Sequence, residues 1–439
     1  MSAPDANRLQ AALADYDAGN LAAAQPVLID LAGRYPNHAE TQAAAGMVLA
    51  EQGSIAAAIP YLKRAHELTP HSAELTLNLA LAQKKMGNTK GAEALLLAAS
   101  KEHADNGSVR AALAQSQVEN GNLPAALESF ARADVLLRAQ GQPIDADLRY
   151  DWAVALLRAD RANQAIAALQ PLPQAGSTAA IQELLGEAEE KTSQYKVALE
   201  HFKKAAELEQ SEPNLYAYGN ELLQHWTFPS AIEIFQFALA RFPSSSRLRL
   251  ALGIAFYGNG NYDQAVPIFE AMLAAEPDNA RTADLLGRSC SALTGTPQAG
   301  CASLQQFAQA HPANAPASLF AAVNILHQPA DLQNSAAANT LLRNALKADP
   351  KLADAWYELG ALQQSQNQWE ESSASLQQAI AARPAYPEAH YRLARAYARI
   401  GKREQAQQEI ALQQKYAAEA KTAENQRMQE VMKFLTTSN

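Results

Sequence analysis

The stretch Ser246–Asn279, SRLRLALGIAFYGNGNYDQAVPIFEAMLAAEPDN, decides the fold. It reads as two short amphipathic helices, separated by a turn at Gly260 and Asn261. Glycine can take the left-handed conformation that ends a helix, and Asn or Ser can cap the helix that follows. The apolar and small residues recur at helical spacing: Leu252, Gly253, Phe256, Tyr262, Ala265, Phe269 and Pro277. One such hairpin cannot bury its own apolar face, so the stretch predicts neighbours of the same kind.

The same pattern recurs along almost the whole chain, in a first helix (helix A) and a second helix (helix B) of each unit. The turn recurs at Gly19, Gly53, Gly87, Gly121 and Gly260. Helix B carries Ala at 24, 58, 92, 126, 165, 198, 231, 265, 299, 338 and 406, and a larger apolar residue four positions later in most units. Helix A carries Gly or Ala at 12, 46, 80, 114, 153, 186, 219, 253, 287, 360 and 394. Small residues at both places let two helices approach closely.

At these spacings the stretch resembles a tetratricopeptide repeat, whose pattern is W-x2-L-G-x2-Y, then A-x3-F, then P. Trp356, Leu359 and Gly360 carry the opening motif in a later unit, where Gln363 stands at the place of the Tyr. The resemblance implies an all-α, right-handed α-solenoid (superhelix) of about twelve helix-turn-helix units over residues 5–420. The expected unit starts lie near 5, 39, 73, 107, 146, 179, 212, 246, 280, 314, 353 and 387.

Residues 421–439 follow the array and are expected to form a C-terminal capping helix and tail. They place one apolar stripe on one helix face, at Met428, Val431, Met432 and Leu435. A stripe of this kind covers the open face of a last repeat. The alternative is a tail that binds a partner or pairs as a coiled coil.

Charge and hydropathy exclude several partners. The chain has 36 Lys and Arg against 45 Asp and Glu, a net charge of −9, and no basic block, so no nucleic acid is expected. No run of eighteen apolar residues predicts a membrane span. The N-terminus lacks a basic start and an apolar core, so the chain as written is expected in the cytoplasm, or in the periplasm if a signal peptide was trimmed from it.

Cys290 and Cys301 are the two cysteines. Zinc takes four ligands, and no CxxC pair or histidine cluster accompanies them, so no metal site is expected. They are either two small buried residues or a disulfide, and a disulfide requires an oxidising compartment.

No catalytic constellation appears. The sequence lacks GxxxxGK[ST], a GxGxxG after a strand, HExxH, GxSxG and an EF-hand loop. We therefore expect no catalytic residue and no cofactor, and a protein that is not an enzyme.

The resemblance also implies a binding surface, because helix A positions two, five, nine and twelve line the concave groove of such solenoids. Tyr and Arg are the side chains most enriched at interface hot spots. The candidate partner-binding residues are Tyr150, Tyr216, Asn220, Leu223, Arg247, Ile254, Tyr257, Arg281, Arg288, Tyr357, Tyr391 and Arg395, with Glu183, Glu187 and Glu190 as an acidic wall. The alternative is that these side chains pack on neighbouring helices or pair with Asp284 and Glu221.

The leading hypothesis is a non-catalytic scaffold or adaptor that binds an unidentified peptide or protein in this groove, with a monomer favoured. One alternative is a periplasmic or envelope assembly scaffold for secretion or polysaccharide export, which a Cys290–Cys301 disulfide would favour. Another is a regulatory subunit of a separately encoded enzyme. The Ala- and Gln-rich, Lys-poor composition gives the impression of a bacterial protein.

Overall fold

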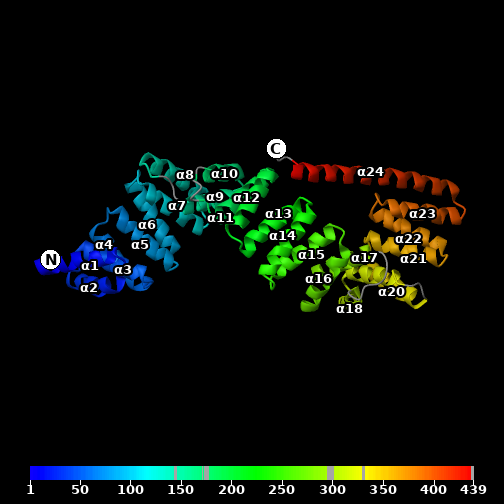
Figure 1. Cartoon of the computed structure of the whole chain (residues 1–439), viewed down its shortest axis with the longest axis horizontal. Coiled ribbons are helices and arrows are strands. Elements are labelled where there is room, and N and C mark those ends of the chain that lie inside the picture. Colours follow the sequence, from blue (N-terminus) through cyan, green and yellow to red (C-terminus); the bar gives the residue numbers. More distant parts are fainter. Residues whose placement is uncertain (143–145, 171, 173–176, 294–300, 329–331, 437–439) are drawn as a thin grey trace. The chain divides into compact units, whose positions relative to one another are not determined.

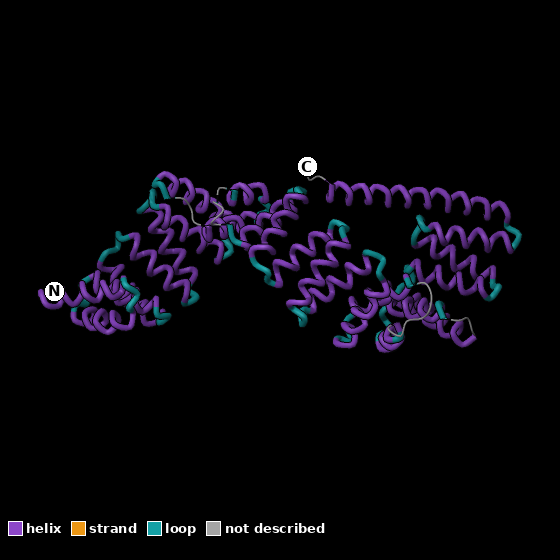
Figure 2. The backbone as a smooth tube through the Cα atoms, in the orientation of Figure 1, coloured by secondary structure: helices purple, strands orange, loops and turns teal. Residues whose placement is uncertain are grey.

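The computed structural model describes residues 1–142, 146–170, 172, 177–293, 301–328 and 332–436. These residues form 24 helices and no strand, which confirms the all-α class (Figures 1 and 2). The helices pack as successive hairpins, so the fold is an α-solenoid. The chain divides into two compact units, Met1–Ala198 and Leu199–Asn439. The superhelical hand remains a prediction.

The helices of the first unit alternate between helix A and helix B of the expected repeats. They are α1 (Ala3–Asp17), α2 (Leu21–Arg34), α3 (Ala39–Glu51), α4 (Ile55–Leu68), α5 (Ala73–Lys85), α6 (Thr89–Glu102), α7 (Gly107–Glu119), α8 (Leu123–Ala139), α9 (Ala146–Arg158), α10 (Ala162–Leu169) and α11 (Ala179–Lys191). The boundary between the units falls within α12 (Tyr195–Leu208).

The second unit continues the alternation. Its helices are α13 (Glu212–Gln224), α14 (Phe228–Arg241), α15 (Ser246–Gly258), α16 (Tyr262–Ala275), α17 (Ala280–Ala292), α18 (Ser303–Ala310), α19 (Ala315–Leu326), α20 (Leu332–Ala348), α21 (Ala353–Ser365), α22 (Trp369–Ala382), α23 (Pro387–Arg399) and α24 (Arg403–Thr436).

Caps and turns explain where these helices begin and end. Helix A often begins after an Asn or Ser whose side chain accepts a backbone N–H three residues on, as Asn279 does from Thr282 at 3.0 Å. The expected turn glycines have positive φ, for example 79° at Gly260. The capping expected after them was wrong in most cases. Asn88 accepts the N–H of Gly91, but the side chains at the N-caps of α2, α4, α8 and α16 make no such bond.

The hairpin interface is close-packed at the predicted columns. The helix B alanines are buried, apart from Ala299, which lies outside the described residues. Helix A glycines meet the large helix B residue of the same hairpin: a Cβ added to Gly253 would lie 2.6 Å from Cε1 of Phe269. Gly46 meets Leu62 and Gly360 meets Leu376 in the same way. The absence of a Cβ is therefore what lets the helices approach this closely.

The hairpin of α17 and α18 departs from this pattern. α18 has 8 residues, whereas the helix B elements α14 and α16 have 14. Gly287 on α17 faces Phe320 of the next helix A, α19, instead of a residue on its own helix B. A disulfide joins Cys290, at the end of α17, to Cys301, just before α18, with the Cα atoms 5.9 Å apart. The sulfurs are thus paired, and they are also buried.

The hydrophobic core is also built from contacts between helices that are neighbours in the sequence. Each described hydrophobic cluster is built from helices that follow one another in the chain, and the largest spans α12 to α19. One, for example, runs from Leu9 to Ala82 across α1 to α5, and another from Leu319 to Leu362 across α19 to α21. Within the described ranges, none of the helices combines the length and apolarity that crossing a bilayer requires.

The last helix differs from the expected arrangement. α24 is a single helix of 34 residues and passes position 420 without a break. The side chains of Met428, Val431, Met432 and Leu435 lie outside the described residues, so the capping role of that stripe remains a prediction.

Candidate functional site

In the first unit, side chains of the two helix A elements α9 and α11 share an open cleft of about 390 Å³. Tyr150 lies in it together with Glu183 and Glu187, and Arg158 and aliphatic side chains of α9 and α11 complete the lining. Burial is the main cause that raises the pKa of both the Tyr150 phenol and the Glu187 carboxyl. Carboxylates beside an aromatic ring attract a cationic group, and Arg158 of this chain lies in the same cleft.

In the second unit, the predicted apolar and aromatic residues of α13 and α15 are only half-buried. Tyr216, Leu223, Ile254 and Tyr257 pack at the margin of the largest described core cluster, and Asn220 is also half-buried. The ring of Tyr257 lies 5.5 Å from that of Tyr262 on α16. These side chains therefore pack on helix B neighbours while keeping part of their surface open.

The predicted cations of α15 and α17 have partners within the chain. The Arg247 guanidinium lies 4.3 Å from the Tyr216 ring centroid and 3.6 Å from a carboxylate oxygen of Glu212. Nε of Arg288 donates to Asp284 at 2.8 Å, which raises the pKa of Arg288. Arg281 is exposed. The pairing with Asp284 expected in the alternative interpretation is therefore present, and both ion pairs are solvent-accessible and weak.

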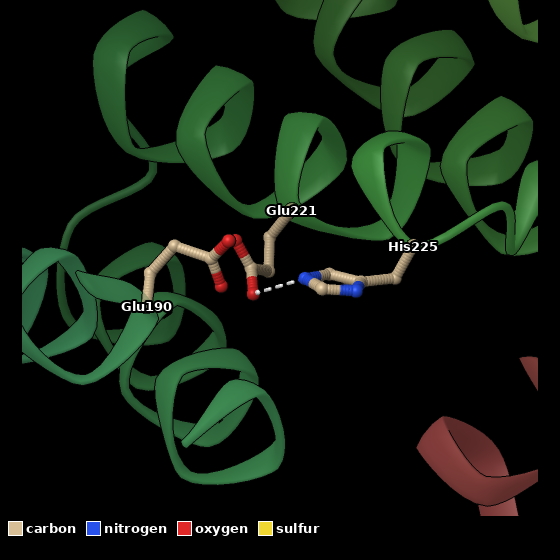
Figure 3. Close-up of side chains that lie close together, drawn as sticks. All are labelled: Glu190, Glu221 and His225. Carbon is tan, nitrogen blue, oxygen red and sulfur yellow. Dashed lines mark ion pairs between the residues drawn. The ribbon is translucent and has the colours of Figure 1, made fainter. Parts of the chain in front are cut away.

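The second expected acid, Glu221, is paired differently. Figure 3 shows Glu221, in the last turn of α13, facing His225, which directly follows that helix. Nε2 of His225 lies 3.4 Å from an Oε1 atom of Glu221, and the carboxylate is buried. Glu221 is therefore no partner of Arg247, whose acidic partner is Glu212.

Three predicted residues meet in a cleft of about 610 Å³ in the second unit. Tyr357 of α21 lines it together with Tyr391 and Arg395 of α23. The ring of Tyr391 is 49% exposed, which is unusual for a large aromatic side chain. Arg395 is also exposed and also lines the adjoining cleft beside Ile410. In this cleft, predicted helix A residues form an open surface that carries both aromatic and cationic side chains.

A hydrogen-bonded network fixes the floor of this cleft. Nε of Arg392 donates to the phenolic oxygen of Tyr357 at 2.9 Å. The Tyr357 ring lies 5.0 Å from the ring of Tyr386, whose hydroxyl donates to Asp354 at 2.9 Å. Burial is the main cause that raises the pKa of Tyr386. Tyr357 is therefore held in one orientation, whereas Tyr391 and Arg395 remain accessible.

Glu358, next to Tyr357 on α21, is a half-buried acid with an unusual titration. Burial raises its pKa from 4.5 to about 7, and the positive charge of Arg392 lowers it only in part. Near neutral pH this carboxyl is therefore divided between its charged and uncharged forms.

The sequence interpretation missed the far wall of the cleft. α24 supplies Gln413, Ala417, Ala420, Lys421 and Glu424 opposite α21 and α23. A signal was available: residues 403–436 contain neither Gly nor Pro, so nothing in the sequence ends the helix at 420. The direction in which this helix runs follows only from the tertiary structure.

Comparison with known families agrees with the repeat pattern. Models described as tetratricopeptide repeat match residues 9–73, 49–116 and 222–288, and one described as TPR repeat matches residues 364–401. No match was found among curated proteins.

Three solved structures are among those that match this chain. The C-terminal part of a TPR repeat-containing protein from Cytophaga hutchinsonii is 17% identical, with 55% of this chain and 96% of that chain covered and a TM-score of 0.45. A tetratricopeptide repeat protein from Parabacteroides merdae is 15% identical, with 69% and 96% covered and a TM-score of 0.37. A chain of the APC/C hetero-tetramer Cut9-Hcn1 is 13% identical, with 97% and 93% covered and a TM-score of 0.37.

Proposed function

Because this chain belongs to the tetratricopeptide repeat proteins, we propose that it is a non-catalytic scaffold that binds a peptide or protein partner on its inner, helix A faces. Stacked helical repeats create extended concave surfaces, and proteins of this architecture use them for binding. The partner is held by side chains that project from several successive helices, so no single repeat carries the site.

The observation that carries this proposal is the cleft shared by Tyr357, Tyr391 and Arg395. An exposed Tyr offers a large contact area and one hydrogen bond at low cost in conformational entropy, and an Arg can grip a carboxylate with two hydrogen bonds. The cleft is open to solvent and its floor is pre-organised by Arg392, which lowers the entropic cost of binding. A partner segment with an acidic residue or a terminal carboxylate fits this chemistry.

The experiment is capture of partners from native lysate by the full-length chain and by three variants. Tyr391→Ala/Arg395→Glu removes the aromatic ring and reverses the charge in the cleft described above. Tyr216→Ala/Tyr257→Ala/Arg288→Glu tests the predicted residues on α13, α15 and α17. Arg343→Glu on α20, which changes an exposed charge on a helix B, is the matched control. We expect a partner that wild type and the control retain and the first variant loses, with helicity unchanged by circular dichroism. Equal capture by all four chains would contradict a binding site on the inner face.

A second function is favoured by the disulfide between Cys290 and Cys301. Disulfides persist in oxidising compartments and are rare in reducing ones. The same scaffold would then serve an assembly in the periplasm or cell envelope. Alkylation of the protein from its native cells, under denaturing conditions without reductant, tests this idea. If neither cysteine is alkylated, the disulfide is present and an envelope scaffold is supported. If both are alkylated, the thiols are free and the idea is contradicted.

A further inference from the structure

Arg427, near the end of α24, contacts Trp226, which lies in the turn between α13 and α14. The guanidinium carbon is 4.1 Å from the centroid of the Trp226 ring, within the range of a cation–π contact. Figure 1 shows α24 running back from α23 toward α13. A helix that begins as helix B of the last repeat therefore reaches the first hairpin of the second unit.

Trp226 occupies a turn position whose left-handed backbone conformation is unfavourable for a large side chain. Most described turns between helix A and helix B carry a left-handed glycine there: Gly19, Gly53, Gly87, Gly121, Gly260 and Gly401. Trp226 takes the same conformation, with φ 62°, although a large side chain is unfavourable in it. Its ring is also 45% exposed. The indole also packs against Phe228, with ring centroids 5.9 Å apart, so the Arg427 contact adds to local packing at a residue held in an unfavourable backbone conformation.

The two halves of α24 are held differently. The first half is fixed to α23: Nδ1 of the buried His390 lies 2.5 Å from Glu409, and the His390 ring stacks on Tyr416 at 5.4 Å. The second half begins at residue 417 and is largely exposed. Its described contacts are the wall of the Tyr391 and Arg395 cleft and the Arg427 contact. Eleven residues of helix, about 16 Å, separate Tyr416 from Arg427.

We propose that residues 417–436 form a displaceable strap, an internal ligand that occupies the inner face of the second unit and is latched by Arg427 on Trp226. A helix held at one end, with little buried surface beyond it, opens at low cost. The partner that replaces it is a helix of the same chemistry: a face toward Tyr391 and Arg395 that carries small residues and an acidic one, as Ala417, Ala420 and Glu424 do, and a basic residue placed over Trp226. The proposal that a helical partner replaces the strap rests on the proposed scaffold function. The proposal of the strap itself does not.

The latch is tested with Trp226→Gly in the full-length chain. Glycine relieves the left-handed conformation and removes the indole, so we expect the urea midpoint to rise while amide exchange at residues 417–427 becomes at least tenfold faster. Asn367→Gly is the matched control, because Asn367 holds the same turn position after α21 with φ 60°. It should also raise the midpoint but leave exchange in α24 unchanged. Unchanged exchange at residues 417–427 in Trp226→Gly would overturn the strap.

The internal-ligand character is tested with a labelled peptide of the sequence 417–436 and full-length chains. Arg427→Glu should unlatch the strap and bind the peptide at least tenfold more tightly than wild type, and adding Trp226→Gly should abolish that gain. Equal binding of the peptide to all three chains would contradict the proposal that the peptide and the strap compete for the same face. Capture of a partner through Tyr391 and Arg395 could still succeed in that case, so failure of the strap is distinguishable from failure of the scaffold proposal.

Discussion

Phe320 of α19 packs directly on the backbone of Gly287 in α17, and a Cβ added to Gly287 would lie 2.2 Å from Cδ2 of Phe320. In other hairpins the helix B partner fills this place, as Phe269 does against Gly253. The shortened α18 has therefore been compensated by a side chain from the following repeat, which couples two repeats through one contact.

Gly287→Ala should destabilise the second unit by about 1–3 kcal/mol, because the added methyl group collides with the Phe320 ring and its Cβ in a packed core. Urea unfolding followed by circular dichroism measures the change. Gly33→Ala in α2 is the control, since nothing lies within 4 Å of the added Cβ. It should stabilise by about 0.5–1 kcal/mol. Equal changes of the unfolding free energy in the two variants would contradict a specific collision with Phe320.

Phe269→Ala should cost about 3–5 kcal/mol, because this ring is fully buried between helices and leaves a cavity. The matched variant is Phe237→Ala on α14, where the ring is 46% exposed and the cost should stay within about 0.5 kcal/mol. Thermal and urea unfolding of both variants give the comparison. Similar losses of unfolding free energy in the two variants would contradict the burial of Phe269 in the hairpin interface.

Reduction of the Cys290–Cys301 disulfide should destabilise the region of α17 to α19. The crosslink closes a loop with a sequence separation of 11, for which loop entropy alone corresponds to about 3 kcal/mol. Amide exchange in α17 and α19 should accelerate in reductant and in Cys290→Ala/Cys301→Ala. The double variant serves as its own control, because reductant should have no further effect on it. Exchange that is the same with and without the crosslink would contradict a stabilising role.

Glu358 should make stability depend on pH in the neutral range. Its pKa is about 7 when folded and 4.5 ordinarily, so the folded chain holds this proton more tightly than the unfolded chain does. The contribution of this protonated carboxyl to the free energy of unfolding is fully present below pH 4.5 and is lost as pH rises through 7. Glu358→Gln should therefore be up to about 3 kcal/mol more stable than wild type at pH 8 and equal to it at pH 4.

Urea midpoints of wild type and Glu358→Gln at the two pH values check this prediction. Glu371→Gln on α22 is the control, because Glu371 is exposed and its replacement should not change the pH profile. A midpoint difference that is the same at pH 4 and pH 8 would rule out titration of Glu358 as the cause.

The repeat register explains which of the candidate side chains share a cleft. The same helix A position in successive units projects from the same face, and Tyr150, Glu183 and Glu187 accordingly line one cleft. Tyr391 and Arg395 share a cleft with Tyr357 for the same reason. The partners of Arg247 could not be read in this way, because they depend on side-chain conformations that periodicity does not specify.

The sequence by itself determined the all-helical class, the hairpin pattern and the buried columns such as Ala265 and Phe269. These features rest on contacts between neighbouring segments, and a local period is enough to specify such contacts. The tertiary structure alone decided that Phe320 packs on Gly287, that Cys290 pairs with Cys301, and that Arg427 reaches Trp226. Such contacts depend on departures from the period and on rotations that accumulate from repeat to repeat, and no single repeat of the sequence encodes that sum.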